Sequence, residues 1–214
     1  MKLGLVMLAA GNSRRFGSNK LLYKVDGQPM YRHILSELEK IQKQLESQGT
    51  QCSITVVTQY DEIAEDVRKR GISALYNLHP EEGISSSLRI GLRKNRDADA
   101  CLFTVSDQPW LRGETVLELI ELFLREGKGI ACVEHSGKTG NPCIFSRKYF
   151  GELMELEGDV GGKRVIRKHR EDTAVLEVLD ERELTDVDVA GRITKYGRGE
   201  VSRRVRSLTL SIFT

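Results

Sequence analysis

The stretch LAAGNSRRFGSNKLL, residues 8–22, follows directly on a hydrophobic run at residues 3–8. It holds two glycines, two arginines and a lysine, so it is too polar for a core and too basic for an ordinary turn. Glycines allow successive backbone N–H groups to converge on an oxyanion. Arg15 and Lys20 can add charged hydrogen bonds to the same group. Together with Gly11, these side chains predict an anion-binding loop.

The spacing within this loop differs from two common phosphate loops. Walker A requires GxxxxGK[ST], but five residues separate Gly11 from Gly17, and Lys20 comes three positions after Gly17. The dinucleotide fingerprint GxGxxG does not occur in the chain. The prediction of phosphate binding therefore rests on the chemistry of the loop and on its place after a strand.

Hydrophobic runs alternate with amphipathic stretches along the chain. Strand-like runs occur at residues 3–8, 53–58, 74–76, 100–105, 129–133, 142–145 and 173–179. Stretches with helical periodicity occur at residues 30–46, 63–70, 86–94, 114–125 and 160–169. This alternation predicts an α/β fold, a Rossmann-like three-layer α/β/α sandwich with a mostly parallel sheet. Ligands of such sheets bind beyond the carboxyl ends of the strands, where the glycine-rich loop lies.

Composition limits the classes of function. The chain has 214 residues, a net charge of +2 and 6% aromatic residues, values that argue against nucleic-acid binding. The longest apolar runs fall well short of the roughly 18 residues that span a bilayer, so we expect no membrane partner. The apolar run after Met1 is short and leads straight into the loop, unlike a secretory signal.

The four cysteines are expected to be free thiols. They are spread along the chain without a CxxC pair, at Cys52, Cys101, Cys132 and Cys143. Most lie in or beside strand-like runs, where a thiol behaves as a small hydrophobe. This usage favours a reducing, cytoplasmic compartment.

The loop resembles the signature L-A-[AG]-G-x-[ST]-x-R-[MF]-G-x-x-K of the MobA-like nucleotidyltransferases, which include molybdenum cofactor cytidylyltransferases and guanylyltransferases. Members bind a nucleoside triphosphate and transfer its nucleoside monophosphate to a phosphate or phosphosugar. The resemblance implies a fold of the nucleotide-diphospho-sugar transferase type. It also implies the nucleotide-binding residues Leu8, Ala9, Ala10, Gly11, Ser13, Arg15 and Lys20.

A second segment, EGISSSLRIGL at residues 82–92, resembles G-[MI]-S-S-S-L-x-x-G-L of the cytidylyltransferase branch. Ser85, Ser86 and Ser87 can cap the following helix and can offer hydroxyls to a base or ribose. Simple capping accounts for one serine more easily than for three. We therefore expect the group to bind nucleotide, without choosing among its members.

The segment VSDQPWL, residues 105–111, resembles the family element G-D-Q-P, and Asp107 falls on its metal-binding aspartate. A carboxylate at the end of a buried strand can hold Mg²⁺ against triphosphate oxygens, with Mn²⁺ possible. The alternative role, a helix cap, fits poorly with Pro109 and Leu111. The resemblance thus implies catalytic roles for Arg15, Lys20 and Asp107.

The segment TDVDVAGRI, from Thr185, stands where the family reads D-I-D-T-P-E-D-L. The resemblance implies that Asp188 is the second metal ligand, with Asp186 as the alternative. Residues 189–191 depart from the family pattern, and a weaker helix start is expected there because proline is lost and glycine gained.

Two segments of the second half match the molybdenum cofactor cytidylyltransferases, GNPCIF at residues 140–145 and GDVGGKRVI at residues 158–166. The resemblance implies that they receive a pterin phosphate through Gly140, Asn141, Pro142, Gly161 and Gly162. The start of a basic helix at Gly161 and Gly162 can bind an anion. An ordinary helix capped by Asp159 is an equally good interpretation.

We expect one nucleotidyltransferase domain over residues 1–196, with a nucleotide half at about 1–110, an acceptor half at about 111–196 and a basic tail at 197–214. In the family that the chain resembles, LAAG marks cytidylyl transfer and LAGG marks guanylyl transfer, so the resemblance implies CTP as the donor. The methyl group of Ala10 also leaves less room beside the base than hydrogen, which suits the smaller pyrimidine. The expected reaction transfers CMP from CTP to molybdopterin. Three alternatives remain: GTP as donor, a sugar or polyol phosphate as acceptor, and a non-catalytic accessory protein of a molybdoenzyme partner.

Overall fold

The computed structural model describes residues 1–12 and 19–187. Its main sheet has seven strands in the order β5-β4-β1-β6-β8-β7-β9. β8 is antiparallel to β6 and β7, and the remaining neighbours are parallel. The strands are β1 (Lys2–Ala9), β4 (Gln51–Thr58), β5 (Ser73–Tyr76), β6 (Ala100–Val105), β7 (Ile130–His135), β8 (Lys138–Ser146) and β9 (Thr173–Glu177). The predicted α/β fold with a mostly parallel sheet is confirmed.

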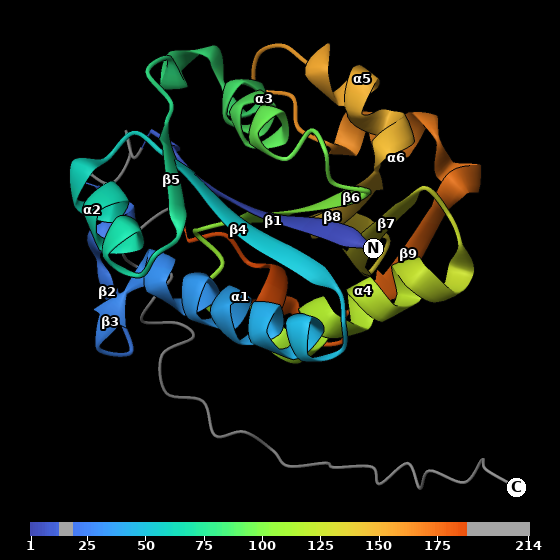
Figure 1. Ribbon diagram of the computed structural model, residues 1–214, viewed down its shortest axis with the longest axis horizontal. Helices are drawn as coiled ribbons and strands as arrows, with labels where there is room; N and C mark the ends of the chain where they lie inside the picture. Colours follow the sequence, from blue (N-terminus) through green and yellow to red (C-terminus); the bar gives the residue numbers. More distant parts are fainter. Residues whose placement is uncertain (13–18, 188–214) are drawn as a thin grey trace, which may run out of the picture.

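Helices cover both faces of this sheet, as Figure 1 shows. One face carries α1 (Met30–Ser47), α2 (Asp61–Lys69) and α4 (Gly113–Glu126), and the other carries α3 (Ile84–Lys94), α5 (Phe150–Met154) and α6 (Lys163–Lys168). Short 3₁₀ turns lie at η1 (Lys20–Leu22), η2 (Pro80–Glu82), η3 (Arg147–Tyr149), η4 (Arg170–Asp172) and η5 (Glu181–Leu184). A small hairpin, β2 (Lys24–Val25) and β3 (Gln28–Pro29), precedes α1.

β1 is buried on both faces, because it lies between β4 and β6 and beneath two layers of helices. Its side chains alternate between the layers: Leu5 and Met7 join one hydrophobic cluster, while Val6 and Leu8 join the other. An uninterrupted hydrophobic strand is therefore what the central position requires.

The second half differs in detail from the sequence prediction. The helix expected at residues 160–169 is the shorter α6, and the strand expected at 142–145 is part of the longer β8. Gly161 and Gly162 thus precede the helix. The tail at 197–214 lies outside the described residues.

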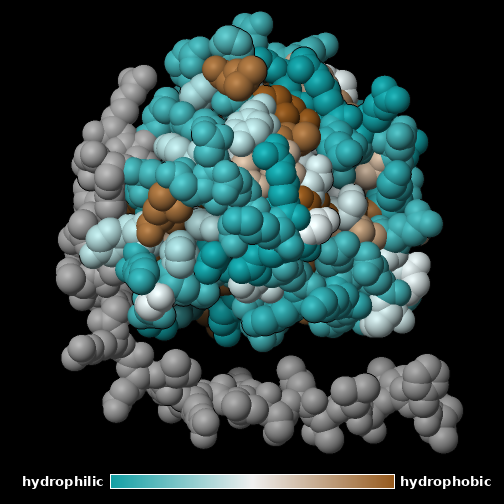
Figure 2. Space-filling view, turned by 60° about the vertical axis from the view of Figure 1, so that its left-hand side comes forward, coloured by the Kyte–Doolittle hydropathy of each residue, from teal (hydrophilic) through white to brown (hydrophobic). Residues whose placement is uncertain are grey.

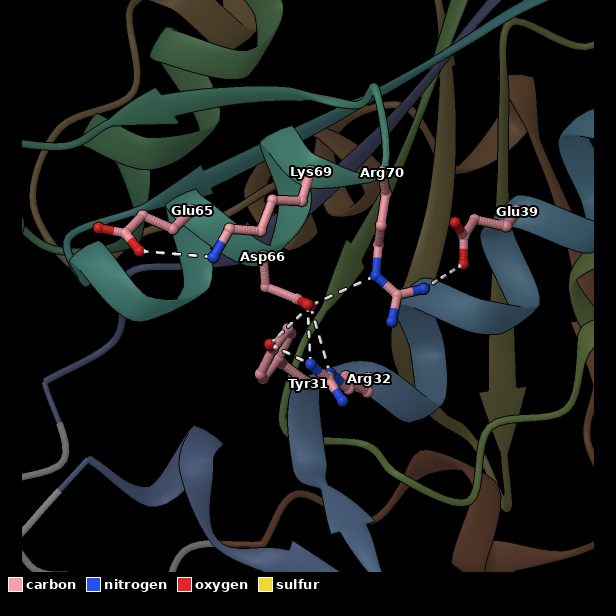
Figure 3. A network of polar contacts seen from close by, with 7 residues as sticks. All are labelled: Tyr31, Arg32, Glu39, Glu65, Asp66, Lys69 and Arg70. Atoms are coloured by element: carbon pink, nitrogen blue, oxygen red, sulfur yellow. Dashed lines mark hydrogen bonds and ion pairs between the residues drawn. The ribbon is translucent and has the colours of Figure 1, made fainter.

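The first two helices are joined by polar contacts, drawn in Figure 3. Asp66 of α2 accepts hydrogen bonds from the Tyr31 hydroxyl (2.8 Å) and the Arg32 guanidinium (2.7 Å), both on α1. Arg70 adds a bond to Asp66 (3.3 Å) and one back to Glu39 on α1 (3.0 Å). Burial by itself would raise the pKa of Asp66, but the bonds from Arg32 and Tyr31 lower it below its usual value. The network holds α2 beside α1.

Among the described residues, the exposed large apolar side chains are few. Figure 2 shows a mostly hydrophilic face with small separate hydrophobic areas. Leu78 and Leu179 are the most exposed large apolar residues among those described, at 78% and 90%. Within residues 1–12 and 19–187, no helix has the length and apolar character needed to cross a membrane.

All four thiols are free, as predicted. Burial raises the pKa of Cys52 and Cys101 to about 12 and that of Cys132 to about 11, and it also raises the pKa of Cys143. A thiol with a pKa of 11 is ionised to about one part in a thousand at pH 8.

We therefore expect the folded protein to react slowly with Ellman's reagent at pH 8, since the thiolate is the reacting form. After unfolding in guanidinium chloride, all four thiols should react at the rate of a free cysteine. Rapid modification of Cys101, Cys132 or Cys143 in the folded protein would contradict their burial, whereas Cys52 is only half-buried.

Glycine allows α3 to lie close to the central strand. A Cβ atom at Gly91 would overlap Val6 Cγ1 and would lie 3.4 Å from Val57 Cγ2. Val6 belongs to β1, which leads into the loop, and Val57 belongs to the neighbouring strand β4, so the helix packs closely on both strands.

Replacing Gly91 by alanine should destabilise the fold by up to about 2 kcal/mol, because overpacking costs about 1–3 kcal/mol and helix propensity returns about 1 kcal/mol. Gly151→Ala, also helical but with no atom within 4 Å of the added Cβ, is the matched control and should be neutral or stabilising. Urea unfolding measures both variants, and equal loss in the two would refute the close-approach explanation.

Candidate active site

The glycine-rich loop leaves the carboxyl end of β1 between the ends of β4 and β6. Leu8, Ala9 and Ala10 are buried, and Gly11 is exposed. The predicted nucleotide-binding residues Ser13 and Arg15 lie outside the described residues. The chain resumes at Asn19, whose side-chain oxygen accepts from the Leu21 amide (3.1 Å) and so begins η1.

Lys20 and Asp107 meet at this edge of the sheet. Lys20 Nζ lies 2.8 Å from Asp107 Oδ2, and the two side chains are 12% and 21% exposed. Asp107 follows β6, whose Val105 pairs with Leu8 of β1. The structure thus brings together two predicted site residues that are 87 positions apart in the sequence. A partly buried cation and a partly buried carboxylate therefore form an ion pair beside the loop.

A segment from the end of the described chain lies against Asp107. The Val187 amide donates to the Asp107 carbonyl (2.9 Å). Gln108, which is 3% exposed, donates through Nε2 to Asp186 Oδ1 (2.9 Å) and to the Leu184 carbonyl (3.3 Å). The segment that contains Asp186 is therefore held next to Asp107. Asp188, the expected second metal ligand, lies outside the described residues.

Glu183 anchors the same segment to α4. Its carboxylate is 1% exposed and accepts from the Arg112 guanidinium (2.7 and 2.8 Å), the Arg112 amide (3.2 Å) and the Thr115 hydroxyl (2.6 Å). The hydrogen bond to Glu183 raises the pKa of Arg112 above its usual value. The N-cap residue of α4, Arg112, makes no side-chain cap hydrogen bond. The Glu183 carboxylate lies at this end of the helix, where a negative charge is favourable because of the helix dipole.

Sequence reasoning missed Glu183 and Gln108. Glu183 stands among acidic and basic neighbours in the run DERELTD, where nothing distinguishes a buried carboxylate from solvated ones. Gln108 belongs to the quoted element VSDQPWL, so that motif was the available signal for it.

Glu183→Ala should lower the free energy of unfolding by about 2–3 kcal/mol, because the buried Thr115 hydroxyl would lose its acceptor. Glu181→Ala, two residues away with an exposed side chain, is the control and should change it by less than about 0.5 kcal/mol. Urea unfolding distinguishes the two, and equal effects would show that Glu183 contributes no more than a surface glutamate.

The three serines lie inside the first turn of α3. This helix begins at Ile84, two residues earlier than predicted, and its N-cap is Gly83, so the alternative interpretation of the serines as caps is wrong. Asn77 Nδ2 donates to the hydroxyls of Ser86 and Ser87 at 2.8 Å each. Ser85 Oγ is buried and makes no hydrogen bond. The nucleotide-binding role of these serines stays a prediction.

The start of α3 also contacts the segment that was expected to bind the acceptor. Gly83 has φ +85°, and a Cβ there would lie 2.5 Å from the carbonyl of Gly158. The Ser85 amide donates to that carbonyl (3.3 Å). Gly83 is therefore required both by its backbone conformation and by a direct approach of two backbones.

The predicted acceptor residues come from two adjoining segments. Gly140, Asn141 and Pro142 lie in β8, with a cis peptide bond between the last two. A Cβ at Gly162 would lie 2.7 Å from Phe145 of the same strand, so packing alone requires glycine there. Gly161 is half-buried.

The start of α6 differs from both interpretations given for it, an anion-binding helix start and a helix capped by Asp159. Its N-cap is Gly162 and has no side-chain hydrogen bond, so the interpretation of Asp159 as the cap is wrong. α6 has six residues, so its contribution to an anion site is small.

The donor atoms at the site suit a hard cation. Asp107 and Asp186 offer carboxylate oxygens, the ligand type that Mg²⁺ and Mn²⁺ prefer. Within the described ranges there is no group of three or more His, Cys, Asp or Glu placed to hold a metal. A cation held by one or two carboxylates takes its other ligands from substrate oxygens and water.

A loop, a lysine and an aspartate meet where the central parallel strands β1 and β6 end, which is the sheet edge at which α/β proteins bind ligands. Comparison with known sequences identifies the family: residues 5–173 match the MobA-like NTP transferase domain, and the chain belongs to this family. The family resemblance predicted from the motifs is confirmed.

Two curated relatives cover most of the chain. Purine catabolism protein PucB of Bacillus subtilis is 29% identical over 199 residues, which are 86% of this chain and 90% of that protein. A probable molybdenum cofactor guanylyltransferase of Pyrococcus horikoshii is 31% identical over 165 residues, which are 74% of this chain and 75% of that protein.

Solved structures show the same fold. Rv0371c from Mycobacterium tuberculosis has a TM-score of 0.73 at 24% identity, covering 90% of this chain and 95% of that chain. The complex of the same protein with manganese has a TM-score of 0.62 at 21% identity, covering 87% and 99%.

Proposed function

We propose that this nucleotidyltransferase transfers CMP from CTP to the terminal phosphate of molybdopterin and releases pyrophosphate. The observation that carries the proposal is the Lys20–Asp107 pair, 2.8 Å apart and partly buried beside the glycine-rich loop. It supplies one group for phosphate oxygens and one for a cation, at the sheet edge where α/β folds bind ligands.

In the proposed reaction an oxygen of the acceptor phosphate attacks the α-phosphorus of the nucleotide. A new P–O bond forms, the bond between the α-phosphorus and the bridging oxygen breaks, and pyrophosphate leaves with its electron pair. The attacking phosphate is already ionised near neutral pH, so little proton transfer is needed. The protein acts by positioning and charge neutralisation, with Arg15 and Lys20 holding the β- and α-phosphates.

A divalent cation would be held by Asp107 and by Asp186 or Asp188. When bound, Mg²⁺ or Mn²⁺ neutralises phosphate charge and orients the donor and acceptor oxygens. The manganese complex of Rv0371c supports a divalent ion in this fold. The bond from Gln108 holds Asp186 in one orientation beside Asp107.

The donor base is proposed from Ala10, which is 4% exposed at the start of the loop. A methyl group there leaves less room beside the base than the hydrogen of glycine and favours the smaller pyrimidine. GTP is the second candidate, supported by the guanylyltransferase name of the Pyrococcus horikoshii relative. The acceptor is proposed to lie along Gly140, Asn141, Pro142, Gly161 and Gly162, with a sugar or polyol phosphate as the alternative.

The test measures pyrophosphate release with molybdopterin and Mg²⁺, comparing CTP, GTP and ATP. We expect release with CTP and a fall in kcat of at least about 10²-fold in Asp107→Asn, because a charge that acts on the transferring phosphates is removed. Asp99→Asn is the control: this aspartate precedes β6, at the opposite end of the strand, and its side chain is 56% exposed.

Each alternative has its own outcome. Release with GTP alone would overturn the role of Ala10 and keep the reaction class. Nucleotide binding without release, with molybdopterin and with sugar or polyol phosphates, would support the non-catalytic accessory role. Equal activity of the Asp107 and Asp99 variants would remove Asp107 from the mechanism.

A further inference from the structure

Three consecutive residues at the end of β4 bind three consecutive carbonyls at the end of β1. Each side chain donates one hydrogen bond: Thr58 Oγ1 to Ala9 O (3.0 Å), Gln59 Nε2 to Ala10 O (2.8 Å) and Tyr60 OH to Gly11 O (2.9 Å). Gln59 also donates to Asn12 Oδ1 (3.0 Å). The backbone pairing of the two strands ends at Ala9 and Thr58. Beyond this pair, hydrogen bonds from side chains connect the two segments.

The direction of these carbonyls fixes the direction of the loop amides. In a regular strand the carbonyls alternate between the two neighbours, and the Leu8 carbonyl indeed accepts from Ser106 beyond β6 (3.0 and 3.1 Å). The Ala10 and Gly11 carbonyls instead face the β4 side together. C=O and N–H of a trans peptide unit point in opposite directions. The Gly11 and Asn12 amides therefore point away from the side chains of Gln59 and Tyr60 that bind those carbonyls.

We propose that Gln59 and Tyr60 are positioning residues of the nucleotide loop. They hold its carbonyls against the end of β4 and so keep two amides directed at the phosphates of the nucleotide proposed to bind beside Lys20 and Asp107. The inference rests on the proposed nucleotide site, and it does not depend on the base or on the acceptor.

These bonds contribute to preorganisation more than to stability. Gln59 and Tyr60 are half-buried and the Gly11 carbonyl is at the surface, where water can replace a lost donor. Without the two side chains the loop would still form, but its amides would sample other directions. A nucleotide would then have to order the loop on binding, which weakens its affinity.

The experiment measures dissociation constants by isothermal titration calorimetry on the full chain with Mg²⁺. The ligands are CTP, GTP and inorganic tripolyphosphate, and the variants are Tyr60→Phe, Gln59→Leu and their double. A lost bond of about 1 kcal/mol predicts an affinity about fivefold weaker for Tyr60→Phe. Gln59→Leu loses two bonds and should bind at least about fivefold more weakly, and the double variant at least about 30-fold more weakly. Tripolyphosphate should lose the same factor, because the amides face phosphate.

Tyr76→Phe is the matched control. The Tyr76 hydroxyl donates to Asp61 of α2 (2.7 Å), an exposed bond of the same kind that does not touch the loop. This variant should bind every ligand as the wild type does. The thermal midpoints of all variants should lie within about 2 °C of the wild type, since the affected bonds are solvent-accessible.

The outcomes distinguish failure of the proposed nucleotide-binding function from failure of the positioning role of Gln59 and Tyr60. If the wild type binds no nucleotide and no tripolyphosphate, the proposed function fails and the inference fails with it. If the wild type binds and the Tyr60 and Gln59 variants bind equally well, only the inference is overturned. Weaker nucleotide binding with unchanged tripolyphosphate binding also overturns it, because the residues would then act on the nucleoside. Loss that tracks a lower midpoint, or that appears in Tyr76→Phe, marks a general structural effect and overturns it as well.

Discussion

The parallel pairing of β1 with β4 on one edge and with β6 on the other is the constraint on which the site depends. Both partners run in the same direction as β1, so three chain segments leave the sheet at one edge. The loop after β1, the side chains after β4 and Asp107 after β6 meet there for that reason. Burial of β1 under helices on both faces makes this arrangement rigid, and the close approach of α3 at Gly91 adds to it.

The features that could be predicted from the sequence are those that depend on neighbouring residues in the chain. The strands and helices follow from hydrophobic period, and Lys20 and Asp107 follow from short motifs beside predicted strands. Both residues occupy the predicted edge of the sheet. The interpretation of the serines as the cap of α3 was wrong because the helix begins earlier, after Gly83. This glycine has a positive φ and lies against the backbone of Gly158, a contact that the local sequence does not reveal. The roles of Glu183 and Gln108 depend on contacts with residues more than 65 positions away, which no local pattern encodes.

Two separate sets of hydrogen bonds hold the chain around Asp107. On one side, hydrogen bonds from Gln108 and Val187 and the buried Glu183 carboxylate hold the acidic segment before residue 188. On the other side, side chains of β4 hold the carbonyls of the glycine-rich loop. The first set is deeply buried and contributes to the stability of the fold. The second set lies near solvent and controls the direction of the loop amides, so substitutions in the two sets should have different effects.

The contact between Gly83 and Gly158 joins the two halves of the chain without any side chain between them. One backbone belongs to the segment predicted to bind the donor nucleotide, and the other leads to the segment predicted to bind the acceptor. A residue with a Cβ at Gly83 would push the two apart, so neither loop can be remodelled independently of the other. If the two segments bind donor and acceptor as proposed, we expect a new acceptor preference on this scaffold to arise together with compensating changes near the nucleotide. Joint change at two distant places in the sequence is the evolutionary trace that this shared boundary would leave.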